Sequence, residues 1–304
     1  MEHVIWTEQP TLRSPVLVVA FSGWNDAGDA ASLAVQQLIS SLPSRLVATI
    51  DPEEFFEFQA TRPQVRLRDG AIREIVWPPN DLYASSAPGG DLLLLSGTEP
   101  QLRWRTFCHE ITEMCKAQQV RMVITLGALL ADVAHSRPVN VLGTASDQSL
   151  IERFDLQRSR YEGPTGIVGV LQHACNEAGI ASASLWAAVP AYAPGTPSPK
   201  AALALVKRVA DMIGIPLDTS NLELASADYE HDVQTNLDED DDLAGYVRRL
   251  EAVHDSGITD DDEDDEAEPD EGDPGLADPA GAPGSADRLV EEVERFLRDQ
   301  GPAA

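Results

Sequence analysis

The chain has few basic residues: 22 Lys and Arg stand against 51 Asp and Glu, for a net charge of −29 at pH 7. Residues 256–287 hold 13 acidic residues and no basic one, which leaves a net charge of −16 for the rest. A negative charge of this size repels polyanions over a long range. Nucleic acids and anionic membrane surfaces are therefore not expected as partners.

The sequence also lacks long apolar runs and paired cysteines. No apolar stretch approaches the ~20 residues of a membrane span, and Met1–Pro10 has no signal-peptide pattern. Cys108, Cys115 and Cys175 form no C-x-x-C pair, so buried thiols in a reducing compartment are expected. We therefore expect a cytoplasmic protein that has no contact with a membrane.

The common catalytic motifs are missing as well. The sequence contains neither the G-x-S-x-G of serine hydrolases nor the H-E-x-x-H of zinc proteases. Its six histidines show no metal-ligand spacing. From these absences we expect no catalytic residue, no metal site and no cofactor.

The most informative stretch that is present follows a buried strand near the start of the chain. Val16–Phe21 is entirely apolar, and a helix-like segment covers Ala30–Ile39. A buried strand, a glycine-bearing turn and a helix are typical of the opening of an α/β sheet. Ligands bind such sheets just beyond the carboxyl ends of the strands. The candidate ligand- or partner-binding residues in this first turn are Gly23, Trp24, Asn25, Asp26 and Gly28.

The first turn lacks what a nucleotide site needs. Gly23 and Gly28 have the spacing of a P-loop, but Asp29 stands where that loop has its lysine. Asp26 and Asp29 would repel a phosphate, and both suit a turn that caps the following helix. Two interpretations stay open, a capping turn or a ligand site. Trp24, a large apolar ring in a loop, is expected to cover a pocket or to meet a partner.

Strand and helix signals alternate through residue 215, which predicts a three-layer α/β/α sandwich with a mostly parallel sheet. Predicted strands lie at 16–21, 45–50, 92–95, 120–126, 139–142 and 184–189, with a hairpin at 65–77. Predicted helices lie at 30–39, 101–118, 147–154, 166–178 and 199–213. We assign residues 1–219 to this domain.

In a parallel sheet, the turns that follow other strands lie beside the first turn, at the edge where the carboxyl ends of the strands meet. The candidates that end predicted strands there are Gly97, Thr98, Glu99 and Gly127. A run ahead of a predicted helix adds two charged groups and a phenol, namely Arg160, Tyr161 and Glu162. The alternative for this run is a plain turn with solvated arginines and a helix cap at Thr165.

The composition changes after residue 219. Residues 220–255 carry a narrow apolar stripe among many charges, which predicts one or two helices that pack on the body or on a second subunit. The candidate contacts with a second subunit are Tyr229, Val233, Val247 and Leu250. Residues 256–287 are expected to form an acidic disordered linker, and residues 288–304 a short amphipathic helix and tail.

Several unusual motifs occur together along the chain. They are GWNDAG at 23–28, GTEP at 97–100, TLGALLAD at 125–132, SRYEGPTG at 159–166 and SLWAAVP at 184–190. Together they resemble the proteasome assembly chaperone 2 family, in its actinobacterial branch. The resemblance implies an α/β/α fold related to nucleoside-phosphorylase-like sandwiches, a helical C-terminal part, and homo-oligomers that are often trimers. Eukaryotic relatives hold proteasome α-subunits during ring assembly without catalysis.

One feature departs from this family pattern. Relatives that dock on the proteasome can end in a hydrophobic-Tyr-any-residue tail, which inserts between α-subunits. Here residues 300–304 read QGPAA, without a tyrosine. Docking through such a tail is therefore not expected.

The sequence leaves two functions open. The first is a non-enzymatic, assembly-chaperone-like protein that forms a homotrimer and binds protein partners, with proteasome subunits as candidates. The second is a small-molecule-binding protein, or a hydrolase- or phosphorylase-like enzyme, with a pocket at the strand ends. The missing catalytic motifs favour the first function, and the first turn with its Gly, Trp, Asn and Asp residues supports the second.

Overall fold

The structure is a computed structural model that describes residues 1–69, 71–87, 89–237 and 240–256. Apart from Ser256, the predicted acidic linker at 256–287 lies outside these residues, as does the predicted terminal helix at 288–304. In the described part of the chain, no helix is both long enough and apolar enough to cross a membrane.

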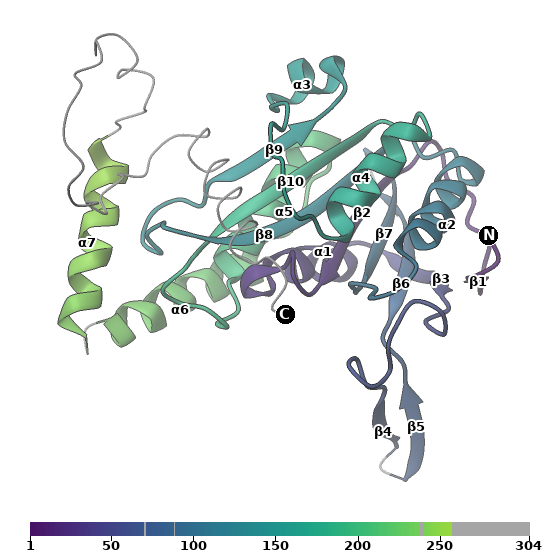
Figure 1. Cartoon of the computed structure of the whole chain (residues 1–304), viewed down its shortest axis with the longest axis horizontal. Helices are drawn as coiled ribbons and strands as arrows, with labels where there is room; N and C mark the ends of the chain where they lie inside the picture. The colour runs from purple at the N-terminus through teal and green to yellow at the C-terminus, as the bar shows by residue number, and fades with distance from the viewer. Residues whose placement is uncertain (70, 88, 238–239, 257–304) are drawn as a thin grey trace, which may run out of the picture.

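Strands and helices alternate in part of the described chain, with strands in succession over residues 44–98 and helices in succession over residues 199–256 (Figure 1). The strands are β1 (Val4–Trp6), β2 (Val16–Ser22), β3 (Ser44–Ile50), β4 (Gln64–Arg68), β5 (Ile72–Val76), β6 (Asn80–Ala87), β7 (Gly90–Thr98), β8 (Met122–Ala131), β9 (Val141–Ala145) and β10 (Ser182–Pro190). The helices are α1 (Ala30–Ser41), α2 (Trp104–Ala117), α3 (Gln148–Phe154), α4 (Ile167–Glu177), α5 (Pro199–Ile213), α6 (Ser220–Leu237) and α7 (Asp241–Ser256), with a short 3-10 turn, η1, at Ala27–Asp29.

Eight of the strands form one sheet in the order β1-β3-β6-β7-β2-β8-β10-β9. The four central strands, β7, β2, β8 and β10, run parallel, and antiparallel pairs flank them on both sides. β2 lies near the middle because its continuous apolar run suits a strand that is buried on both faces. The predicted α/β sandwich is therefore confirmed, with its parallel part at the centre of the sheet.

Helices cover both faces of this sheet (Figure 1). α1 and α5 lie on one face, where Ala34 and Ala202 are fully buried and allow the two helices to pack closely. α2 and α4 lie on the other face. There Phe107 of α2 contacts Phe21 and Phe55 edge-on, with ring centroids 5.7 and 5.2 Å apart. The core therefore consists of two halves, one on each side of the sheet.

Two glycines that were expected in turns lie inside strands. A Cβ on Gly97, in β7, would come within 1.9 Å of the Asn80 side chain. A Cβ on Gly127, in β8, would come within 2.6 Å of the Trp186 ring. At both positions a neighbouring side chain leaves no room for a Cβ, so glycine is required there. The expectation that each glycine follows the end of its strand is wrong.

α6 and α7 pack onto the body of the same chain. The predicted subunit contacts Tyr229, Val233, Val247 and Leu250 are between 3% and 6% exposed, and they form one apolar cluster with Ala134. A contact with a second subunit through these four side chains would require α6 and α7 to leave this position. That contact stays a prediction.

Candidate functional site

The ends of β2 and β7 and the start of α4 meet around one carboxylate, that of Glu99. Its Oε1 accepts hydrogen bonds from the backbone N–H of Ile167, at 2.9 Å, and from the side-chain amide of Asn25, at 3.1 Å. Its Oε2 accepts a hydrogen bond from the backbone N–H of Trp24, at 3.3 Å. The structure thus brings together three of the predicted site residues, Trp24, Asn25 and Glu99, in what we call the Glu99 cluster.

Glycines permit this close approach. Gly23 has a φ of 132°, and a Cβ there would lie 3.2 Å from the Glu99 Cβ. A Cβ on Gly166, directly before α4, would lie 2.1 Å from the Asn25 amide nitrogen. Gly166 belongs to the motif at 159–166, which gives no direct indication of its contact with the first turn. A glycine immediately ahead of a helix was the signal that could have indicated a close contact.

Glu99 occupies the position that an anionic ligand takes in many α/β proteins. Ile167 is the first residue of α4, so its N–H has no partner within the helix. Free N–H groups at a helix N-terminus attract phosphates and carboxylates. Here the carboxylate of the chain itself accepts from that N–H. An anionic ligand at the Ile167 N–H would have to displace Glu99.

Asp26 caps α1. Its Oδ1 accepts hydrogen bonds from the backbone N–H groups of Ala31, at 2.7 Å, and Ser32, at 3.2 Å, and its Oδ2 accepts one from the Ser32 hydroxyl. Burial raises the pKa of Asp26, and the hydrogen bonds from Ser32 and Ala31 partly oppose that rise. The capping interpretation is therefore confirmed for Asp26. It is wrong for Asp29, which is exposed and makes no side-chain cap hydrogen bond.

Trp24 is partly buried, and the remaining candidates of the first turn and of β7, Gly28 and Thr98, have packing roles. Gly28 lies against the start of α5, where its backbone oxygen accepts from the N–H of Ser198 at 2.7 Å and a Cβ would crowd Ser198 at 3.1 Å. The Thr98 hydroxyl accepts from the Ser22 hydroxyl at 3.5 Å. These residues hold the edge of the sheet together.

Arg160, Tyr161 and Glu162 lie on the loop that leads into α4. Arg160 and Glu162 are exposed, and the Tyr161 hydroxyl donates to the backbone oxygen of Pro164 at 2.6 Å. The loop reaches the Glu99 cluster further along, at Gly166 and Ile167. The run therefore presents charged groups at the surface next to the cluster.

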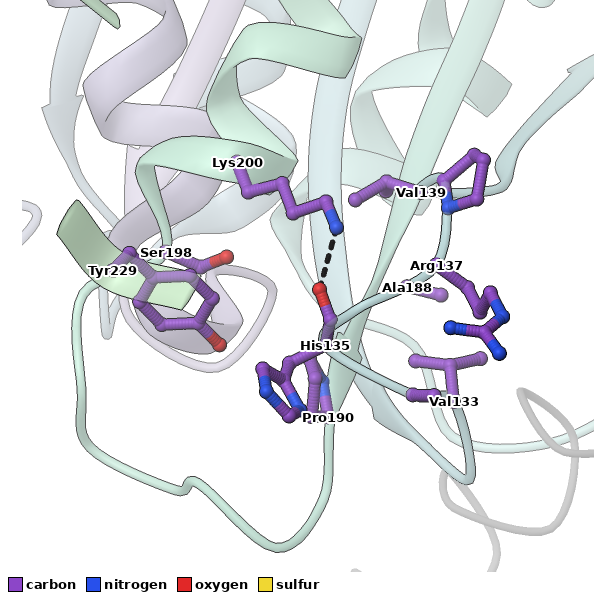
Figure 2. A pocket seen from close by; sticks show the side chains of 11 residues that line it. Val133, His135, Arg137, Val139, Ala188, Pro190, Ser198, Lys200 and Tyr229 are labelled. Carbon is purple, nitrogen blue, oxygen red and sulfur yellow. Dashed lines mark hydrogen bonds between the residues drawn. The ribbon is translucent and has the colours of Figure 1, made fainter. Parts of the chain in front are cut away.

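A small cavity lies where α5 and α6 meet the loop after β8 (Figure 2). Its volume of about 10 Å³ leaves room for one water molecule at most. Lys200 donates to the backbone oxygen of His135 and pairs with Glu230, both at 2.5 Å. Burial, with a contribution from Lys200, lowers the pKa of His135. The cavity lies at the contact between the body and α6, and it is too small to hold a substrate.

A wider, open groove of about 640 Å³ runs between α2 and α4. Arg105, Lys116 and Glu177 line it, together with the buried Cys108. Burial raises the pKa of Cys108 to about 12, which disfavours the thiolate form at neutral pH. Among the described residues, no group of three or more His, Cys, Asp or Glu side chains is placed to hold a metal ion.

The fold and the site define an α/β/α sandwich protein whose strand-end site is filled by its own carboxylate. The chain belongs to the PAC2 family, because the model of that family matches residues 20–236. This finding confirms the resemblance drawn from the sequence motifs. No curated protein matches the chain.

Solved structures are similar to most of the chain. A PAC2 family protein from Streptomyces avermitilis is 44% identical with a TM-score of 0.72, over 77% of this chain and 99% of that one. A Mycobacterium tuberculosis proteasome-assembly chaperone homologue is also 44% identical, with a TM-score of 0.70, over 76% and 99%. PbaA of Pyrococcus furiosus, an archaeal homologue of proteasome-assembly chaperone, is 16% identical with a TM-score of 0.57, over 82% and 98%, and it shares the fold.

Proposed function

We propose that this chain is a non-enzymatic, chaperone-like protein that binds protein partners in the cytoplasm, with proteasome subunits as the candidate partners. The observation that carries the proposal is the Glu99 cluster. Three donors that an anionic substrate could use at the strand ends, the N–H groups of Trp24 and Ile167 and the Asn25 amide, are taken by Glu99 itself. The 44% identity to the M. tuberculosis proteasome-assembly chaperone homologue supports the choice of partner.

The proposed contact surface is the carboxyl edge of the sheet around the Glu99 cluster. Trp24 is partly exposed there, and the exposed Arg160 and Glu162 add charges of both signs. Aromatic and arginine side chains of this kind contribute much of the binding energy in protein interfaces. We further propose that the chain works as a homo-oligomer, with a trimer as the expected size.

The test is a proteasome assembly reaction from separately purified α- and β-type subunits of the same organism. The full chain is expected to bind one type of free subunit and to change the rate at which complete particles form on native gels. Trp24→Ala should weaken this effect, whereas Leu224→Ala, at a 68% exposed position on α6, should not. Absence of binding to both subunit types at tens of micromolar would overturn the proposal.

A further inference from the structure

The hairpin of β4 and β5 stands away from the rest of the molecule and exposes apolar side chains (Figure 1). Val65 lies opposite Ile75, and Leu67 lies opposite Arg73, so these four side chains share one face. Leu67 is 61% exposed, Ile75 51% and Val65 49%. A lone two-stranded hairpin is at best marginally stable in water. The four residues, which we call the arm face, therefore have the character of an interaction surface.

A second surface with exposed apolar side chains lies at the edge of the main sheet. Ile5 pairs with Thr49, Thr49 with Asp81, and Leu46 with Tyr83, which places all five on one face of β1, β3 and β6. On that side of the sheet Tyr83 is partly buried against the core beneath α1 and α5, whereas Ile5 and Leu46 are not part of that core. Ile5 is 51% exposed and Leu46 43%. We call the five residues the edge patch.

The two surfaces have opposite charges. Arg73 lies on the arm face and Asp81 on the edge patch, and neither forms an ion pair within the described part of the chain. Residues 62–77 contain four arginines and two acidic residues, although the whole chain has a net charge of −29. A basic arm on an acidic chain is attracted to the body of a second copy. A second copy is thus the occupant that the charges favour.

We propose that the arm face packs onto the edge patch of a second copy, with Arg73 beside Asp81 of the partner subunit. The inference rests on the self-association proposed above and names its surface. Because the arm face and the edge patch are different surfaces, the contact is heterologous, and successive copies form a ring if the rotation closes. Apolar side chains on both surfaces would lose their contact with water in such a ring.

Sedimentation velocity of the full chain tests this contact with Leu67→Asp on the arm face and Leu46→Asp on the edge patch. Both side chains are exposed, so both variants are expected to fold. Each substitution should raise the dissociation constant for self-association by about tenfold or more. Leu224→Asp, at a 68% exposed position on α6, is the matched control and should associate like the unchanged chain.

A mixture of the two variants distinguishes this contact from other modes of association. In the mixture, the intact arm face of one variant meets the intact edge patch of the other. Heterodimers should therefore form at concentrations where each variant alone is monomeric. A mixture that stays monomeric, or an oligomer that Leu67→Asp does not weaken, would overturn the arm contact. An unchanged chain that is monomeric at tens of micromolar would overturn self-association too, while partner binding is decided separately by the proteasome assembly reaction.

Discussion

At the scale of single residues, Glu99 is the group on which the strand-end site depends. Its carboxylate joins the first turn, the end of β7 and the start of α4, which are far apart in the sequence. Its Oε2 accepts from the backbone N–H of Trp24 and its Oε1 from that of Ile167. Glu99 therefore stabilises the edge of the sheet and at the same time closes it to other anions.

Glu99→Ala should lower the free energy of unfolding by about 1–3 kcal/mol, because the N–H groups of Trp24 and Ile167 lose their acceptor. Added acetate should raise the melting temperature of Glu99→Ala more than that of the unchanged chain, since the small anion can take the vacated place. Glu99→Gln, which keeps one acceptor oxygen, is the control. A Glu99→Ala variant as stable as the unchanged chain would contradict this role.

Asp26 gives a prediction for the dependence of stability on pH. Its pKa in the folded chain is raised above the ordinary value of 3.8 by burial. The folded chain therefore keeps a proton that the unfolded chain releases, so the contribution of Asp26 to stability falls as the pH rises from 3.8 through the raised pKa. Asp26→Asn keeps an acceptor oxygen but has no such proton.

Urea unfolding of the unchanged chain and of Asp26→Asn, at steps from about pH 4 to pH 7, measures this difference. The stability of the unchanged chain relative to Asp26→Asn is expected to decline across that range. Asp29→Asn, at the exposed position nearby, serves as the control. Two stability curves that run parallel over the whole range would show that Asp26 does not titrate as expected.

At the scale of elements, an apolar cluster attaches α6 and α7 to the body, and polar contacts surround this cluster. Val247 and Leu250 of α7 are buried in the cluster that includes Ala134. The Tyr246 hydroxyl donates to Asp132 at 2.6 Å, and Arg137 pairs with Asp255 at 2.7 Å. Surface pairs of this kind contribute little, so the apolar cluster accounts for most of the attachment.

Val247→Asp should release α7 from the body, because it would bury a carboxylate without a cation. Hydrogen exchange in residues 241–256 should then rise by about tenfold or more, while the central strands stay protected. The matched control is Arg248→Asp, since Arg248 is exposed on the same helix. If both variants exchange alike, the cluster does not hold α7. If Val247→Asp also dissociates an oligomer without loosening α7, the predicted subunit contact is supported instead.

Sequence patterns predict the central strands and several flanking ones, including the hairpin of β4 and β5, but they miss β6. β2 is a continuous apolar run because both of its faces are buried. In β6, apolar and polar residues alternate less clearly, because Asn80, Ser85 and Ser86 are among its residues. The sequence pattern therefore does not indicate this strand. The Glu99 cluster is partly predictable, because turns after parallel strands converge at one edge. The role of Gly97 inside β7 depends on Asn80, a contact that no local pattern contains.

At the scale of the whole molecule, the chain combines a strand-end site that is closed with two apolar surfaces that are open. In the Glu99 cluster the Ile167 N–H already donates to Glu99. The small cavity beside Lys200 has room for one water molecule at most. The arm face and the edge patch, by contrast, expose apolar side chains to solvent. The exposed apolar side chains on these two surfaces support the proposal that the chain binds proteins.

The measurement that tests this claim most directly is native mass spectrometry of the full chain isolated from its own cells under gentle conditions. We expect complexes whose added mass equals that of whole protein subunits, identified as proteasome subunits by peptide sequencing, with no stoichiometric small molecule. Glu99→Ala, isolated in the same way, checks whether opening the site admits an anion. A small molecule bound at one equivalent per unchanged chain, and lost on substitution in the Glu99 cluster, would contradict the claim.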